Sequence, residues 1–230
     1  MQLTFTSRYG KGDGRSMFQT PVSLEYGITD RWQVEVAWDA QRRRTEIGER
    51  VMRGAGDFSI GTQYSFMNMA RSNVHSAVGF EVTLPTANIK EDLTEGFVEY
   101  EPYFIIAKDF PNLNRMQVFS QVGLGFNQRA RRHRDADDEE PTAHEFNLGI
   151  GTFVPFRRAV LTAEYNLSTN RWNNGGDERE MYFTPGVMWR LPRNWQVGFA
   201  APIGLTDDSD KFGTVFKLIY EFNILGKDAK

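Results

Sequence analysis

In several segments every second residue is polar, and many of these polar residues are acidic. Glu99 and Glu101 stand two residues apart, and Glu25 and Glu35 lie in the two halves of one stretch, residues 20–41. Carboxylates in this pattern can attract cations or pair with Lys and Arg, and a buried carboxylate needs a counter-charge or water. The three His and the absence of Cys give no zinc-ligand spacing. The sequence therefore predicts neither a metal site nor a cofactor.

Nucleophilic catalysis is not indicated either. Ser76 and Ser120 fall on apolar faces of their segments, where a lipid-modifying enzyme would need a Ser–His pair. No His lies on the same face of a neighbouring segment. We expect that the protein is not an enzyme, and an outer-membrane lipid-modifying enzyme is the least favoured alternative.

The stretch 20–41 shows what positions these residues. Val22, Leu24 and Tyr26 alternate with polar residues in its first half, and Trp32 to Trp38 do so in the second. Period-two alternation indicates strands, and residues 29–31 are a short polar turn. Each half is roughly ten residues long, above the usual five or six, and its apolar face ends in aromatic residues. A strand that meets lipid with its middle and the two interfaces with its ends has this pattern.

The same unit recurs along the chain. Twelve strands are predicted: 2–9, two in 20–41, 56–66, 74–84, 97–108, 116–127, 145–156, 161–167, 181–189, 195–205 and 212–222. Long and short connections alternate between them, as in outer-membrane barrels. We therefore predict an all-β fold, a transmembrane antiparallel up-and-down β-barrel in one domain, residues 1–222, with residues 223–230 as a C-terminal periplasmic extension. Both termini are expected to be periplasmic, in the Gram-negative outer membrane, after a signal peptide that preceded residue 1.

Two features test this fold prediction. Pro102, Pro155, Pro185 and Pro202 lie inside predicted strands, where we expect bulges or local irregularities because proline cannot donate to the ladder. A soluble β-sandwich would have strands about half as long, with turns every ~8–12 residues. No apolar run approaches the ~20 residues of a membrane helix, and a net charge of −3 gives no case for nucleic-acid binding.

The polar face of the strands would line the lumen of such a barrel. The residues predicted to line the path of a solute are Glu25, Glu35, Glu81, Glu99, Glu101, Tyr103, Gln121, Glu145, Glu164, Tyr182, Lys217 and Glu221. One interpretation is a narrow, acidic channel for passive uptake or efflux of small solutes by a monomer. The alternative is a non-conducting structural or envelope-anchoring barrel, in which these groups pair and plug the lumen. Inward glycines such as Gly79 would make space, or would let Tyr103 or Tyr182 lie flat against the wall.

Two arginine clusters fall in predicted long loops. They are Arg42, Arg43 and Arg44 in the loop 42–54, and Arg131, Arg132 and Arg134 in the loop 128–142. Arginine binds phosphate with forked hydrogen bonds, so these residues are candidates for contact with lipopolysaccharide. Solvated loops are the competing interpretation, and the acidic run 135–140 could attract divalent cations or simply be solvated.

Several stretches resemble a known family. GAGD at residues 54–57 runs into FSIGTQYSF, GFEVTLPTAN spans residues 79–88, and a closing section spans residues 183–222. These are similar to the Gram-negative outer-membrane family named for the MetA pathway of phenol degradation. The resemblance implies an outer-membrane barrel that acts as a passive transporter of small, often aromatic or hydrophobic, molecules. Outer-membrane barrels commonly end on an aromatic residue, whereas Phe222 is followed here by further residues.

Overall fold

The computed structural model describes residues 1–12, 15–46, 51–69, 71–91, 93–94, 96–129, 144–171 and 178–222. Its elements are β1 (Gln2–Lys11), β2 (Arg15–Gly27), β3 (Trp32–Glu46), β4 (Met52–Gly54), β5 (Phe58–Met69), β6 (Val74–Leu84), η1 (Ile89–Glu91), β7 (Phe97–Phe110), β8 (Met116–Arg129), β9 (Glu145–Phe156), β10 (Ala159–Thr169), β11 (Arg179–Arg190), β12 (Trp195–Ala200), β13 (Ile203–Gly204) and β14 (Phe212–Glu221). No helix in these residues has the length and hydrophobicity needed to cross a membrane.

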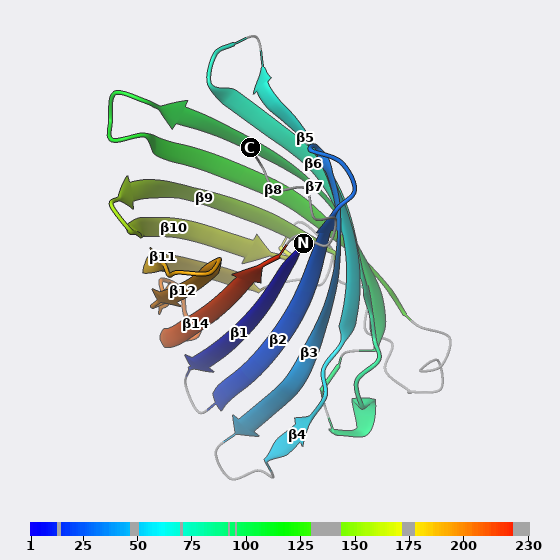
Figure 1. Ribbon diagram of the computed structural model, residues 1–230. Coiled ribbons are helices and arrows are strands. Elements are labelled where there is room, and N and C mark those ends of the chain that lie inside the picture. The colour runs from blue at the N-terminus through cyan, green and yellow to red at the C-terminus, as the bar shows by residue number, and fades with distance from the viewer. Residues whose placement is uncertain are drawn as a thin grey trace.

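The strands follow chain order around one antiparallel sheet that closes on itself (Figure 1). β1 pairs with β2 on one side and with β14 on the other, from Gln2 opposite Glu221 to Lys11 opposite Phe212. At the seam, the Phe222 amide donates to the Met1 carbonyl at 2.9 Å. The result is a closed barrel of twelve strands, because β4 extends the wall beside β3 and β13 continues the line of β12. The predicted fold class is confirmed.

The apolar face of each strand lies on the outside of the barrel. Val36 and Ile60, in the middle of β3 and β5, are 39% and 48% exposed. The buried hydrophobic side chains among the described residues are Ala77, Ala87, Leu93 and Ile219. A soluble protein of this size would bury its large apolar side chains. This outer surface is instead suited to hydrocarbon, and aromatic pairs such as Trp195 and Tyr220, with ring centroids 4.6 Å apart, lie near its edge.

Short turns gather at one end of the barrel, together with the first and last strand ends. The turn from β11 to β12 places Arg193 and Asn194 at φ values of 60° and 62°. Positive φ at both central residues is the conformation that matches the twist of a two-stranded hairpin. Longer connections lie at the other end, as the alternation in the sequence predicted for all but the first of them. The long connection expected after the first strand is wrong, because β1 extends to Lys11 and β2 already begins at Arg15.

The hydrogen-bonded pairing between strands is irregular at only some of the four prolines where we expected it to be. The expected strand 195–205 is interrupted at Ala201 and Pro202, which separate β12 from β13. Around Pro102, pairing of β7 with β8 lapses between Tyr100 and Tyr103 without a change of register. Pro155 pairs in a continuous ladder with β10, so the irregularity expected there is wrong. Pro185 also pairs continuously with β10, but on its other side the ladder lapses between Phe183 and Gly186, opposite the break at Pro202, as expected. Both prolines accept through their carbonyl groups, which proline retains.

A bulge in β3 has the larger consequence. Gln19 of β2 pairs with Arg42 but Pro21 pairs with Asp39, so Thr20 faces two residues of β3. One extra residue reverses the faces of everything beyond it. Asp39 and Arg42 therefore both point inward. The loop that we expected at 42–54 is wrong in its extent, because β3 continues to Glu46 and pairs with β4.

The outward face predicts where charge is not tolerated. Replacing Val36 or Leu148 with Arg places a guanidinium against hydrocarbon and is expected to lower the free energy of unfolding by about 2–4 kcal/mol in lipid vesicles. The control is Gln121→Arg, on the inner face of β8, which should cost much less. Urea titrations of the three refolded variants make this comparison. Equal stability of the inner and outer variants would contradict the assigned faces.

Candidate functional site

The inner face of the barrel holds all the residues predicted to line the solute path. Their positions alternate with the exposed apolar residues, and the registers keep them in phase from strand to strand. The sequence pattern therefore found the correct face. Whether a solute contacts these residues stays a prediction.

Five of these carboxylates lie in one row of paired residues, which we call the acidic row. The register runs from Glu221 of β14 through Gln2 to Glu25 of β2 and Glu35 of β3. It continues through Gly61 to Glu81 of β6 and Glu101 of β7. The pairs Glu25–Glu35 and Glu81–Glu101 place like charges directly opposite each other.

Like charges opposite one another destabilise a sheet unless water or counter-ions screen them. The ends of the acidic row have polar partners: Gln196 donates to Glu221 at 2.8 Å, and Asn147 donates to Glu101 at 3.3 Å. Glu25, Glu35 and Glu81 make no hydrogen bond and no ion pair with the described residues. These three carboxylates thus depend on lumen water and mobile cations.

Tyr103 narrows the lumen beside the acidic row. It lies flat over Gly79, where an added Cβ would come 2.1 Å from the ring, and its hydroxyl donates to Gln63 at 3.3 Å. The predicted use of Gly79 as a seat for Tyr103 is confirmed. The ring thereby stays against the wall, where it narrows the lumen less than a ring that pointed inward would.

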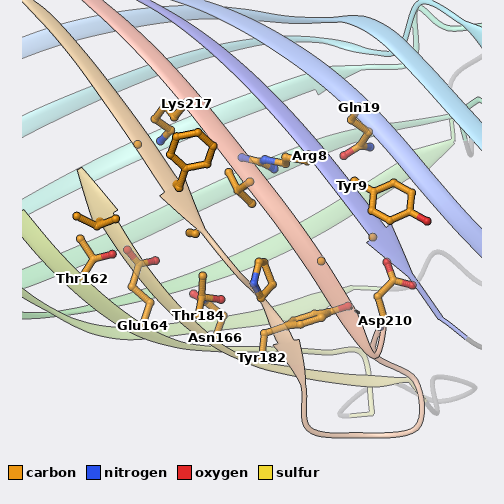
Figure 2. Close-up of a pocket in the computed structure, with 18 of the residues that line it drawn as sticks. Arg8, Tyr9, Gln19, Thr162, Glu164, Asn166, Tyr182, Thr184, Asp210 and Lys217 are labelled. Atoms are coloured by element: carbon orange, nitrogen blue, oxygen red, sulfur yellow. Dashed lines mark hydrogen bonds between the residues drawn. The ribbon is translucent and has the colours of Figure 1, made fainter. Parts of the chain in front are cut away.

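A cavity of about 610 Å³ fills the lumen between β9–β14 and β1–β2. Arg8 of β1 and Lys217 of β14 point toward each other at one side of it (Figure 2). Glu164 and Asn166 of β10 and Thr184 of β11 gather at the other side (Figure 2). The cavity therefore carries two cations on one side and Glu164 with neutral polar groups on the other, and Glu180 and Asp210 add two further carboxylates to its lining.

These groups have no close partners in the described part of the chain. The side chains of Arg8, Lys217, Glu164, Asn166 and Thr184 make no hydrogen bond there and no ion pair within 4.0 Å. Lys217 is near enough to Glu164 and Glu35 to interact electrostatically, as Arg8 is with Asp39. Arg8 is exposed to the lumen, and Lys217 and Glu164 are half-buried. The polar groups are consequently available to a solute.

Three charged residues of this cavity are absent from the solute path predicted from the sequence: Arg8, Glu180 and Asp210. Arg8 and Glu180 share the polar face of their strands with Thr6 and Tyr182, so the alternation already contained the signal. Asp210 lies in the connection from β13 to β14, where no periodicity reveals which way a residue points. Its amide donates to the Tyr182 hydroxyl at 2.9 Å, which holds the connection over the mouth of the cavity.

A second inward connection is fixed by Arg42. Its guanidinium donates to Asp39 Oδ2 at 3.0 Å and to the Leu93 carbonyl at 2.8 Å. Leu93 is 1% exposed and packs where Gly54 has no side chain. Of the predicted lipopolysaccharide contacts, Arg42 is thus engaged within the barrel and Arg44 shares its inner face. Arg43 lies on the outer face, whereas Arg131, Arg132 and Arg134 lie outside the described residues.

His75 forms a smaller polar cluster near the short turns. Its Nε2 is 3.1 Å from Asp109 Oδ2, and its Nδ1 accepts from the Asn68 amide. No set of three His, Asp or Glu residues suited to a metal ion occurs in the described residues. Ser76, considered above as a nucleophile, is buried with its hydroxyl 3.3 Å from the Met69 sulfur.

Comparison with known proteins assigns this barrel to a family. A family model described as HAEPLYID-like matches residues 4–221. No curated protein matches. The barrel expected from the phenol-degradation resemblance is confirmed, whereas membership of that particular family is not.

Solved structures of porins and channels share the fold. The KdgM porin has a TM-score of 0.61 at 9% identity, over 96% of this chain and 99% of that chain. The NanC porin has a TM-score of 0.64 at 8% identity, and the match covers 96% of this chain and 100% of that chain. An outer membrane channel from Pseudomonas putida F1 has a TM-score of 0.69 at 12% identity, and the match covers 96% of this chain and 94% of that chain. At these sequence identities the likeness shows the fold, a transmembrane barrel, and does not identify a solute.

The position of the Tyr103 ring over Gly79 can be tested through its effect on conductance. Gly79→Val would push the ring off the wall and into the lumen, so we expect a smaller conductance with the barrel still folded. Gly79→Val combined with Tyr103→Ala should restore the conductance. Single-channel recordings measure both, and an unchanged conductance in Gly79→Val would contradict this role of Tyr103.

Proposed function

The chain belongs to the HAEPLYID-like family, and from its closed barrel and polar lumen we propose that it is a passive channel of the Gram-negative outer membrane for small polar solutes. The observation that carries the proposal is the cavity inside the barrel, where Arg8, Lys217 and Glu164 have no close partner among the described residues. A barrel whose only task was anchoring would gain stability by pairing those groups or replacing them with apolar ones.

The path through the barrel follows two neighbouring cavities. The larger one opens toward the long connections, and one of about 450 Å³ lies nearer the short turns, beside Asp109 and Arg190. Phe153, Thr162 and Met188 line both cavities, so we infer that the path passes between them at this level. Phe153 stacks on Phe119 with ring centroids 4.9 Å apart, which makes it a firm boundary of the passage.

Charge in the lumen determines which solutes pass most easily. The acidic row lies on β14, β1–β3, β6 and β7, whereas Arg8 and Lys217 lie together on β1 and β14. Carboxylates outnumber cations along the row, so small cations are favoured over anions of equal size. Opposed charges also create a field across the lumen, which favours polar solutes. Small aromatic compounds remain candidates through the phenol-degradation resemblance.

The membrane setting completes the proposal. The short turns and both chain ends face the periplasm, and the long connections face outward, where Arg43, Arg131, Arg132 and Arg134 are candidates for contact with lipopolysaccharide phosphates. Because β1 pairs with β14, the first and last strands of the barrel leave no open edge between them, so a monomer is sufficient. Residues 223–230 would form a periplasmic extension beyond the last strand.

Ion selectivity tests the channel directly. We expect the refolded protein in a planar bilayer under a KCl gradient to conduct, with a reversal potential that favours K⁺. In the double variant Glu35→Gln/Glu81→Gln, the reversal potential should move toward zero, because two unpaired lumen charges are lost. Asp207→Asn, an exposed residue outside the strands, is the matched control. A folded barrel that never conducts would favour the plugged, structural alternative.

The passage between the cavities can be tested with one side chain. Phe153→Ala removes the ring that borders both cavities and should raise the single-channel conductance. Phe156→Ala, on the outer face of the same strand, should leave it unchanged. If both variants conduct as the unmodified protein does, the path does not run past Phe153.

A further inference from the structure

The larger cavity has the charge arrangement of a binding site for one class of solute. We infer that it binds a small zwitterion, whose carboxylate faces Arg8 and Lys217 and whose ammonium group faces Glu164 (Figure 2). This inference deepens the proposed channel function and rests on it, since the solute must enter the lumen to bind. It goes beyond that proposal by naming a chemical class and the groups that recognise it.

The cationic wall is made by closure of the barrel. Lys217 pairs with Thr6, and Arg8 pairs with Val215, so the two cations are diagonal neighbours on adjacent strands. Two positive groups held side by side repel each other unless an anion lies between them. Arginine offers a planar fork for a carboxylate, and the ammonium group of lysine adds a compact charge. A solute carboxylate is the complement that both groups lack.

The facing wall is built to accept donors. Glu164 pairs with Thr184 across β10 and β11, and Asn166 follows two residues later on the same face. The carboxylate, amide and hydroxyl oxygens of these residues are all acceptors without a donor in the described part of the chain. An ammonium group can donate to several of them at once. A purely anionic solute would instead place its charge close to Glu164 and gain less.

Space between the walls suits a small molecule. The cavity has a volume of about 610 Å³, and Gly198 of β12, which has no side chain, is part of its lining. Lys217 and Glu164 do not close the gap by pairing within 4.0 Å. A ligand whose two charges are separated by a short chain can therefore reach both walls. A molecule with one charge satisfies one wall and leaves the other unpaired, at a cost in free energy.

Binding of 4-aminobutyrate tests the inference without relying on transport. Isothermal titration calorimetry on the whole refolded chain in detergent measures the affinity for 4-aminobutyrate, butyrate and butylammonium. Butyrate keeps only the carboxylate of 4-aminobutyrate, and butylammonium keeps only its ammonium group. We expect 4-aminobutyrate to bind about tenfold more tightly than either, equivalent to about 1.4 kcal/mol. Tighter or equal binding of butyrate would replace the zwitterion site with an anion site, and no detectable binding of 4-aminobutyrate would overturn the inference.

Variants assign the two walls. Arg8→Gln, Lys217→Gln and Glu164→Gln should each weaken binding of 4-aminobutyrate, whereas Lys11→Gln and Asp207→Asn, both exposed, should not. Folding is checked by heat-modifiable mobility on gels. The exchange Lys217→Glu with Glu164→Lys retains both charges and should bind better than either single reversal. Equal affinity in all these variants would contradict the assignment.

Conductance separates this inference from the proposed function. If the barrel carries K⁺ in bilayers but binds no 4-aminobutyrate, the channel stands and the zwitterion site falls. If it binds 4-aminobutyrate and never conducts, the site stands as a ligand site in a closed barrel, and passive transport falls.

Discussion

The ladder between β1 and β14 is the interaction on which the rest of this structure depends. Inside a bilayer no water can satisfy a free backbone amide, so a sheet survives there only when its two edges pair. The β1–β14 ladder extends from Gln2 to Lys11 and leaves no open edge. Closure also brings the first and last strands together, and with them Arg8 and Lys217. The same hydrogen bonds thus stabilise the barrel and assemble the cationic wall of its cavity.

Closure fixes the register, and the register creates the chemistry of the lumen. A strand offers alternate residues to the inside, so each strand can contribute one carboxylate to a shared level. Glu25, Glu35, Glu81 and Glu101 meet in one row because the short turns hold their strands in step. Water or cations in the lumen would reduce the repulsion along this row. Its energetic cost is consistent with a lumen whose polarity is used for solutes.

The connections at the end with the longer loops also contribute to the lumen. Arg42 binds the carbonyl of Leu93, and Tyr182 accepts from the Asp210 amide, so two connections are held inward. Each contact depends on a local departure from regular pairing, the bulge in β3 in one case and the break at Pro202 in the other. Irregular backbone therefore shapes the mouth, and the regular strands supply the wall.

The sequence by itself determined the barrel, its strand number and the face of the strand residues outside the bulged part of β3, because side chains in a strand alternate strictly and lipid enforces that pattern. Val74–Leu84 is recovered with the predicted bounds. Arg8 and Glu180 belonged to the same pattern and were overlooked. Only the tertiary structure decided which inward residues are neighbours: the pairing of Glu81 with Glu101, the approach of Arg8 to Lys217, and the inward turn of Arg42. Those contacts depend on register and on a one-residue bulge, which no local periodicity encodes.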